Sequence, residues 1–161
     1  VLEIARQETT LPIIAQLSLH EIGVVQGGLT VEQAFQRLED LGADVIGLNC
    51  RLGPYYMLRS LEEVPLPKRA FLSAYPNASL PYYRDGRLAY PSDPTYFEES
   101  ALALHKEGVR LLGGCCGTTP AHIAAIAKVV KGLQPITEKE VKRIGNRVSV
   151  QSEHKREKHI H

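Results

Sequence analysis

Three cysteines are the residues of this 161-residue chain whose types and positions could do chemistry. Cys50 follows a mostly apolar run, 44–49, and Cys115 and Cys116 follow another such run after two glycines. Thiolates are ligands that zinc binds readily, and three of them leave one tetrahedral position open, as in catalytic zinc sites. Adjacent cysteines on a regular strand would point to opposite faces, but flanking glycines let the backbone turn both sulfurs toward one ion.

Two other interpretations of the cysteines remain open. A disulfide between the neighbours Cys115 and Cys116 would close a strained ring, and three cysteines are too few for a disulfide scaffold. Free cysteines are also common buried residues without a chemical role. The clustering of all three cysteines at predicted strand ends, beside glycines, favours the metal site.

The elements that would position these cysteines alternate between strand and helix. Short apolar runs predict buried parallel strands, and apolar residues spaced three or four apart predict amphipathic helices. Thr30 and Gln33 have the spacing of a capping box, and Pro94 and Pro120 stand where proline begins a helix. We expect strands over 12–19, 44–50, 69–74 and 109–112, helices over 1–8, 30–41, 54–63, 94–107 and 120–130, and a long loop over 75–92.

This alternation predicts an α/β protein with a parallel sheet and helices outside it. A doubly wound sheet and part of an eight-stranded barrel both fit the pattern. In both architectures ligands bind at the carboxyl ends of the strands. Because all three cysteines fall at these ends, we expect the site there.

The composition, 43% hydrophobic and 23% charged, is that of a globular protein, and the formal net charge of +1 gives no reason to expect a nucleic-acid or membrane partner. No stretch approaches the roughly 20 apolar residues of a membrane helix, and no secretory signal is visible. We therefore expect a cytoplasmic protein with reduced cysteines. The first residue is Val1 rather than Met, which indicates that the chain begins inside a longer one.

The charge is unevenly distributed along the chain. Residues 136–161 contain seven Lys and Arg and four Glu, whereas residues 1–135 contain 12 basic and 14 acidic side chains. The last segment is also poor in large apolar residues, as solvated segments are. We divide the chain into a globular body, 1–134, and a polar basic segment, 135–161, which is a linker, an arm that packs on another part, or the start of a following domain.

Three motifs resemble those of a known family. They are Gly-Leu-Asn-Cys at 47–50, Ser-Ala-Tyr-Pro-Asn-Ala at 73–78 and Gly-Gly-Cys-Cys-Gly-Thr-Thr-Pro-Ala-His-Ile at 113–123. Together they look like the homocysteine S-methyltransferase family, which includes the homocysteine-binding module of cobalamin-dependent methionine synthase and a betaine-dependent enzyme. The family fold is a (βα)8 TIM barrel. The resemblance, over about residues 1–134, implies the C-terminal half of that barrel, strands 5 to 8.

The resemblance also implies a reaction. Cys50, Cys115 and Cys116 would be the catalytic zinc ligands, and the thiol of homocysteine would take the open position, lose its proton and attack the methyl group of a donor to give methionine. S-adenosylmethionine, S-methylmethionine, methyltetrahydrofolate and betaine all serve as donors within this resemblance, so the small-molecule donor is not identified.

The same resemblance implies partners for the chain. The basic segment resembles, more weakly, the junction in bacterial proteins where a methylenetetrahydrofolate reductase module follows. We expect a preceding half-barrel to complete the fold. The reductase domain is a second candidate partner, and the protein is also a candidate for forming oligomers. The half-barrel alone is expected to be inactive. The alternative function is a non-catalytic barrel fragment or metal-binding module that folds only with a partner segment.

Three residues at strand ends are candidate substrate-binding residues: Asn49, Asn77 and Ser18. Asn49 and Asn77 have an equally good structural interpretation as turn formers that bond their own backbone. His122, inside the last helix, is expected to be a surface or packing residue rather than a ligand. A phosphate-binding enzyme is disfavoured, because residues 113–117 lack the lysine and the glycine spacing of phosphate loops.

Overall fold

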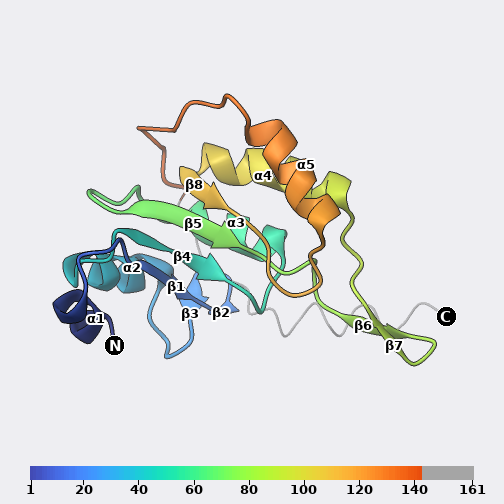
Figure 1. Cartoon of the computed structure of the whole chain (residues 1–161), viewed down its shortest axis with the longest axis horizontal. Coiled ribbons are helices and arrows are strands. Elements are labelled where there is room, and N and C mark those ends of the chain that lie inside the picture. The colour runs from blue at the N-terminus through green and yellow to red at the C-terminus, as the bar shows by residue number, and fades with distance from the viewer. Residues whose placement is uncertain (143–161) are drawn as a thin grey trace.

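The structure, a computed structural model, describes residues 1–142 and is built around a four-stranded parallel sheet (Figure 1). The strand order is β1-β4-β5-β8, and each neighbouring pair is parallel. The strands fall on the four predicted apolar runs, so the expected parallel α/β sheet is confirmed. Their bounds are β1 Ile14–Leu17, β4 Val45–Asn49, β5 Phe71–Tyr75 and β8 Val109–Leu112.

The helices begin where their capping residues predict. Thr30 Oγ1 accepts the backbone N–H of Gln33 and Gln33 Oε1 accepts that of Thr30, each at 3.1 Å, which completes the expected capping box. Asp93 accepts the N–H of Tyr96 at 2.9 Å at the start of another helix. The helices are α1 Leu2–Glu8, α2 Val31–Asp40, α3 Pro54–Leu61, α4 Pro94–Lys106 and α5 Pro120–Val130.

One face of the sheet forms the main core with the helices. Ile46, Leu48 and Leu72 point to this face and are at most 1% exposed. Helix side chains of the same cluster are Phe35 of α2, Met57 and Leu61 of α3, and Leu104 of α4. Burial of each large apolar side chain stabilises the fold by roughly 1.5–3 kcal/mol, so this face holds the strand ends in fixed positions.

The opposite face of the sheet is polar in the middle and uncovered at its amino end. Gln16 Nε2 donates to Ser73 Oγ at 3.0 Å. This bond crosses Gly47 of β4, where a side chain would overlap Ser73. One row closer to the amino end, Ile14 and Phe71 flank Val45 and are 49% and 45% exposed. In the described part of the chain this apolar row therefore has no helix over it.

Two short hairpins correct the sequence prediction. The first pairs β2 Leu19–Glu21 with β3 Val24–Val25, so the strand expected to reach residue 19 ends at residue 17. The second pairs β6 Tyr82–Arg84 with β7 Arg87–Ala89 inside the segment predicted as a loop. Asp85 and Gly86 both have positive φ, 50° and 74°, which makes the two-residue turn that suits a hairpin. Figure 1 shows this hairpin projecting beyond the carboxyl ends of the sheet.

Part of the predicted polar segment lies against the body. The side chain of Lys139 is 3% exposed, forms an ion pair with Glu107 at 2.9 Å and donates to the carbonyl of Leu61 at 2.5 Å. The N–H of Lys142 donates to the carbonyl of Glu62 at 3.0 Å. Residues 135–142 thus cross the ends of α3 and α4, and the rest of the segment, 143–161, lies outside the described residues. The boundary at residue 134 stays a prediction.

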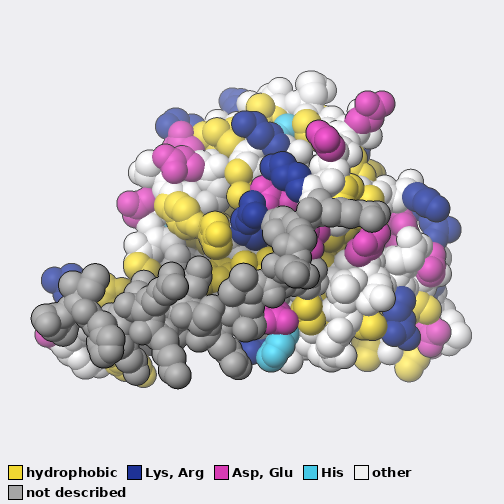
Figure 2. All heavy atoms as spheres, turned by 180° about the vertical axis from the view of Figure 1, so that it is seen from behind, with side chains coloured by type: hydrophobic (Ala, Val, Ile, Leu, Met, Phe, Trp, Pro, Cys, Tyr) yellow, Lys and Arg dark blue, Asp and Glu magenta, His cyan; other side chains and the backbone are white. Residues whose placement is uncertain are grey.

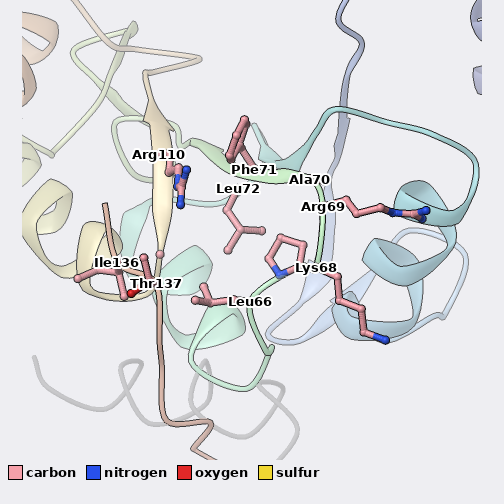
Figure 3. Close-up of a pocket in the computed structure, with 11 residues that line it drawn as sticks. Leu66, Lys68, Arg69, Ala70, Phe71, Leu72, Arg110, Ile136 and Thr137 are labelled. Atoms are coloured by element: carbon pink, nitrogen blue, oxygen red, sulfur yellow. The ribbon is translucent and has the colours of Figure 1, made fainter. Parts of the chain in front are cut away.

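The charged surface and one cavity lie apart from the cysteines. Basic and acidic side chains are interspersed on the face seen in Figure 2. A cavity of about 190 Å³ opens at the amino ends of β5 and β8, lined by Phe71, Leu72, Arg110 and Ile136 among others (Figure 3). The cysteines follow the opposite ends of the strands. Within residues 1–142, no helix has both the length and the apolar character needed to cross a membrane.

Candidate metal centre

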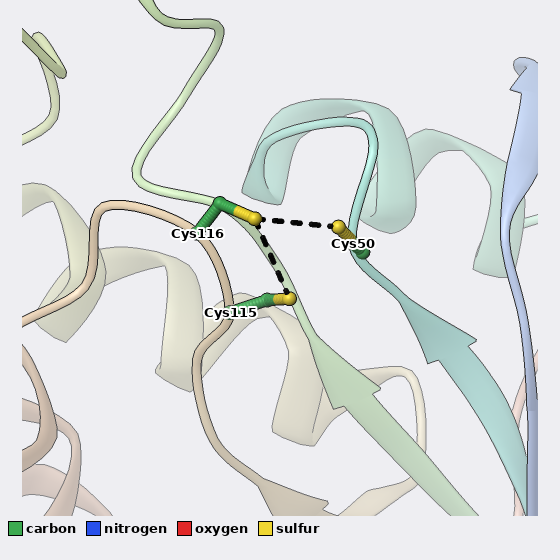
Figure 4. Close-up of side chains that lie close together, drawn as sticks. All are labelled: Cys50, Cys115 and Cys116. Atoms are coloured by element: carbon green, nitrogen blue, oxygen red, sulfur yellow. Dashed lines mark hydrogen bonds between the residues drawn. The ribbon is translucent and has the colours of Figure 1, made fainter. Parts of the chain in front are cut away.

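Cys50 follows β4 through a turn of unusual conformation. Cys50 and Arg51 have φ values of 58° and 62°, a left-handed region that costs non-glycine residues about 1–2 kcal/mol each. The N–H of Cys50 donates to the carbonyl of Tyr75 at 3.0 Å, and the N–H of Leu52 donates to that of Cys50 at 2.7 Å. These bonds hold the turn, which directs the Cys50 thiol toward the loop that follows β8 (Figure 4).

Cys115 and Cys116 lie on that loop, between β8 and α5, in a tight glycine-flanked turn. The N–H and the hydroxyl of Thr118 both donate to the carbonyl of Cys115, at 3.2 Å and 2.7 Å. Gly114 packs so closely on Thr118 that a side chain there would overlap it, and Gly117 has a φ of 77°. As the flanking glycines predicted, the backbone turns both sulfurs toward Cys50.

Residues 75–78, which follow β5, connect the two cysteine segments. On one side, Tyr75 accepts the N–H of Cys50, and the N–H of Asn77 donates to Leu52 at 3.3 Å. On the other side, the N–H of Cys115 donates to the carbonyl of Pro76, and the N–H of Ala78 donates to the carbonyl of Cys116, both at 2.9 Å. The sequence did not indicate this connection, because backbone hydrogen bonds leave no signature in residue type.

The three thiols have the spacing of ligands around one ion. The Sγ of Cys116 lies 3.6 Å from that of Cys50 and 4.0 Å from that of Cys115, and all three sulfurs lie within 4.8 Å of one another (Figure 4). Zinc–sulfur bonds of about 2.3 Å at tetrahedral angles place sulfurs about 3.8 Å apart. The donor set and its geometry therefore fit zinc, and all three cysteines are free of disulfides.

The thiols differ in their affinity for protons. Burial raises the pKa of Cys50, but hydrogen bonds from the Arg51 N–H, the other two thiols and the Asn77 amide outweigh this effect, so its pKa lies below the ordinary value. Burial and the neighbouring Cys50 raise the pKa of Cys115 to about 11. Cys50 thus loses its proton more readily than Cys115 does. A bound cation would have to displace the proton of Cys115.

The three candidate substrate-binding residues lie at the same end of the sheet but differ in surroundings. Asn77 is 5% exposed and its amide lowers the pKa of the Cys50 thiol, while its Oδ1 has no hydrogen-bond partner among the described residues. Asn49 is half-buried at the end of β4, one residue before Cys50. Ser18 donates to the carbonyl of Asn49 at 3.2 Å. The structure thus brings Asn77 directly to the thiols and connects Ser18 to them only through backbone.

A cluster of three thiols at the carboxyl end of a parallel α/β sheet defines a candidate thiolate metal centre. Comparison with protein families identifies the class: the model described as homocysteine S-methyltransferase matches residues 1–130. The chain belongs to this family, and the resemblance of its cysteine motifs is confirmed at that level.

The chain is similar to part of two much longer proteins. The methionine synthases of Mycobacterium tuberculosis and Mycobacterium leprae are 36% identical over 125 residues and 35% identical over 136 residues, which is 77% and 81% of this chain. These alignments cover only 10% and 11% of the two synthases, so the chain spans about a tenth of their length.

The fold is likewise similar to part of two longer solved chains. Crystal structures of the homocysteine methyltransferase MmuM from Escherichia coli, in apo and oxidized forms, match with a TM-score of 0.58 at 21% identity. The matches cover 80% and 79% of this chain but 43% and 39% of the solved chains. The parallel sheet therefore corresponds to part of a homocysteine methyltransferase barrel.

Proposed function

We propose that this chain is the metal-binding part of a zinc-dependent homocysteine S-methyltransferase, which transfers a methyl group from a small-molecule donor to the thiol of homocysteine and forms methionine. The observation that carries the proposal is the convergence of Cys50, Cys115 and Cys116 within 4.8 Å. Family membership supports the reaction class. The identity of the donor is left open, since no described residue distinguishes one donor from another.

In this proposal the three thiolates hold the zinc and leave one position for substrate. Zinc bound there would stabilise the substrate sulfur as a thiolate, which is the nucleophile of the methyl transfer. The Asn77 amide beside Cys50 lowers the pKa of this thiol and so favours the thiolate that a metal ion binds. The unpartnered Oδ1 of Asn77 is an acceptor for a donor group of the substrate, because a buried amide oxygen is stabilised when it is paired. Asn49 and Ser18 are proposed to line the same end.

The proposal extends to the architecture. We infer that β1, β4, β5 and β8 are strands 5 to 8 of a (βα)8 barrel, whose interior is the face that carries Gln16 and Ser73. The exposed Ile14 and Phe71 support this, because apolar residues of that row would be buried by further strands. A preceding half-barrel and a following reductase domain are the partners expected on this basis.

Zinc content and cysteine variants test the metal site. We expect about one zinc per chain and, for Cys50→Ser, Cys115→Ser and Cys116→Ser, zinc binding at least about 100-fold weaker, because even outer residues of metal sites change affinity 10–100-fold. Circular dichroism of each variant controls for folding. Zinc retained at wild-type affinity in any well-folded variant would contradict the assignment.

A second candidate is a metal-binding module without activity of its own. It is favoured by the coverage of 43% or less of the solved chains, since a half-barrel lacks the contacts of the other half. Proton release on addition of homocysteine to the zinc-loaded chain distinguishes the two candidates. Release of a proton supports substrate binding at the metal, and its absence together with full zinc occupancy favours the inactive module.

A further inference from the structure

His122 is a buried histidine that the proposed chemistry does not use. It lies in the first turn of α5, six residues after Cys116, and is 6% exposed. Its ring packs edge-on against Phe97 of α4, with centroids 4.9 Å apart and planes at 77°. Both ring nitrogens have partners, so its burial is satisfied by specific hydrogen bonds rather than by packing alone.

Those partners determine which nitrogen carries the proton. The backbone N–H of Thr119 points at Nδ1 from 3.1 Å, and a backbone N–H can only donate, so Nδ1 is unprotonated. The Thr119 hydroxyl, 2.9 Å from Nδ1, then also donates. Nε2 lies 3.0 Å from the carbonyl oxygen of Ser92, which can only accept, so Nε2 carries the hydrogen. The contacts thus specify the neutral ring protonated at Nε2.

The bond to Ser92 closes a ring of contacts around the cysteine loop. Ser92 donates its N–H to the carbonyl of Ala78 at 3.4 Å, and its side chain also bonds that of Ser79. Ala78 in turn donates its N–H to the carbonyl of Cys116 at 2.9 Å. From Cys116 the chain runs on to Thr119, which donates to His122. The cysteine loop is therefore held on one side by residues 76–78 and on the other by His122.

We infer that His122 is a positioning residue for the metal centre: through its Nε2–H bond to Ser92 it fixes residues 76–78 against the Cys115–Cys116 loop and so sets the spacing of the thiols. This inference rests on the proposed function, because it concerns the affinity of the same site for its metal. His122 itself touches neither thiols nor substrate in this role. Its effect passes through Ser92 and Ala78.

The chain itself indicates that capping alone does not require histidine. At the start of α2 the same position of the capping box is occupied by Gln33, whose Oε1 accepts the N–H of Thr30 at 3.1 Å. Glutamine at position 122 would therefore preserve the cap of α5. It would lose the imidazole ring, in which Nδ1 serves the helix cap and Nε2 forms the bond to Ser92. The bond to Ser92 would therefore be lost. His122→Gln thus separates the helix cap from the positioning contact.

A matched control is available in the same chain. His105, near the end of α4, also bonds a backbone carbonyl through Nε2, that of Gln134 at 2.9 Å. Its neighbours belong to the end of the sheet opposite the thiols. His105→Gln therefore removes a contact of the same kind, and its effect on the metal site should be negligible.

Cobalt binding is the test, because Co²⁺ bound to thiolates absorbs visible light with an intensity and position that report its geometry. Titrations of the wild-type chain, His122→Gln and His105→Gln with Co²⁺ should give an affinity 10–100-fold lower for His122→Gln, with altered bands, and an unchanged affinity and spectrum for His105→Gln. Equal affinity and equal spectra in wild type and His122→Gln would overturn the inference and leave the proposed function standing. A wild-type chain that binds no Co²⁺ or Zn²⁺ would instead overturn the proposed function and the metal role inferred from it.

The tautomer gives a second measurement that needs no variant. Nitrogen-15 NMR of the wild-type chain should show His122 as the neutral ring with the hydrogen on Nε2. A ring protonated at Nδ1 would contradict the contacts from which the inference is built, even if His122→Gln failed to fold.

Discussion

Replacement of Glu39 should destabilise the chain far more than replacement of its acidic neighbour. Glu39 is 4% exposed near the end of α2, where a carboxylate is opposed by the helix dipole. It is held there by the three residues that precede β5: Oε1 accepts the N–H groups of Arg69 and Ala70 at 2.5 Å and 2.8 Å, and Oε2 lies 3.4 Å from the N–H of Lys68. One side chain thus anchors the segment that leads into β5 to α2.

The magnitude follows from the two short bonds. Hydrogen bonds to a charged group contribute about 1.5–3 kcal/mol each, and the bond at 3.4 Å adds little. Glu39→Ala leaves the buried N–H of Ala70 and the partly buried N–H of Arg69 without their acceptor, and should lower the free energy of unfolding by about 3–6 kcal/mol. Glu39→Gln retains one acceptor oxygen without charge, so its effect should be smaller. Against a typical total of about 5–15 kcal/mol, the alanine variant would be largely unfolded in moderate urea.

The same carboxylate gives the chain an acid-sensitive component of stability. Burial raises the pKa of Glu39, but the backbone N–H groups of Ala70, Arg69 and Lys68 and the charge of Arg69 outweigh it, so its pKa lies below the ordinary 4.5. A depressed pKa means that the unfolded chain binds the proton more readily, so this stability is complete above the ordinary value and is lost as the pH falls through the folded value. Glu39→Gln should lack this component.

Urea unfolding followed by circular dichroism, at neutral and at acidic pH, measures both effects. Asp40→Asn is the matched control, because the contacts of Asp40 with Gln36 at 2.9 Å and with Arg69 at 3.8 Å are both exposed, and exposed ion pairs contribute about 0–1 kcal/mol. If Glu39→Ala unfolded at the same urea concentration as Asp40→Asn, or if Glu39→Gln kept the acid dependence of the wild type, the reasoning would be refuted.

Two further substitutions probe the loop and the segment after α5. Gly117→Ala should lower the free energy of unfolding by about 1–3 kcal/mol and weaken metal binding, because position 117 has a φ of 77° and faces the ring of Tyr90; a variant with wild-type stability would show that the loop can yield. Lys139→Ala should lower the free energy of unfolding by about 3 kcal/mol, because it leaves the carboxylate of Glu107, which is only 12% exposed, without its partner. Lys128→Ala, at an exposed ion pair, should lower it by at most about 1 kcal/mol in the same urea assay. Equal losses in the two lysine variants would contradict the difference in burial.

The elements that the sequence predicted are those whose signals are local. The apolar run around Ile46 and Leu48 marks a strand by itself, and Thr30 with Gln33 marks a helix start within four residues. The convergence of the cysteines followed from one general rule, that parallel strands end at the same edge of a sheet. Their role as metal ligands stays a prediction.

The features that were missed depend on distant residues or on very short elements. Glu39 occupies a polar position of an amphipathic helix, and its burial is explained by the segment before β5, about 30 residues later. The bond between His122 and Ser92 spans a similar separation. Asp85 and Gly86 did carry a local hairpin signal, but the flanking strands are three residues each and do not show an alternating pattern long enough to recognise.

The register of the sheet determines whether the thiols can meet. Asn49 pairs with Tyr75, and Ala74 pairs with Leu112, so each cysteine segment leaves the sheet at a defined height. A slip of one residue between neighbouring strands would displace one segment by about 3.3 Å and reverse the faces of its side chains. Metal–ligand distances tolerate only about 0.2 Å. A metal ion would therefore bind the three thiols only when the strands are correctly paired. During folding it would stabilise the correctly paired sheet relative to misaligned forms.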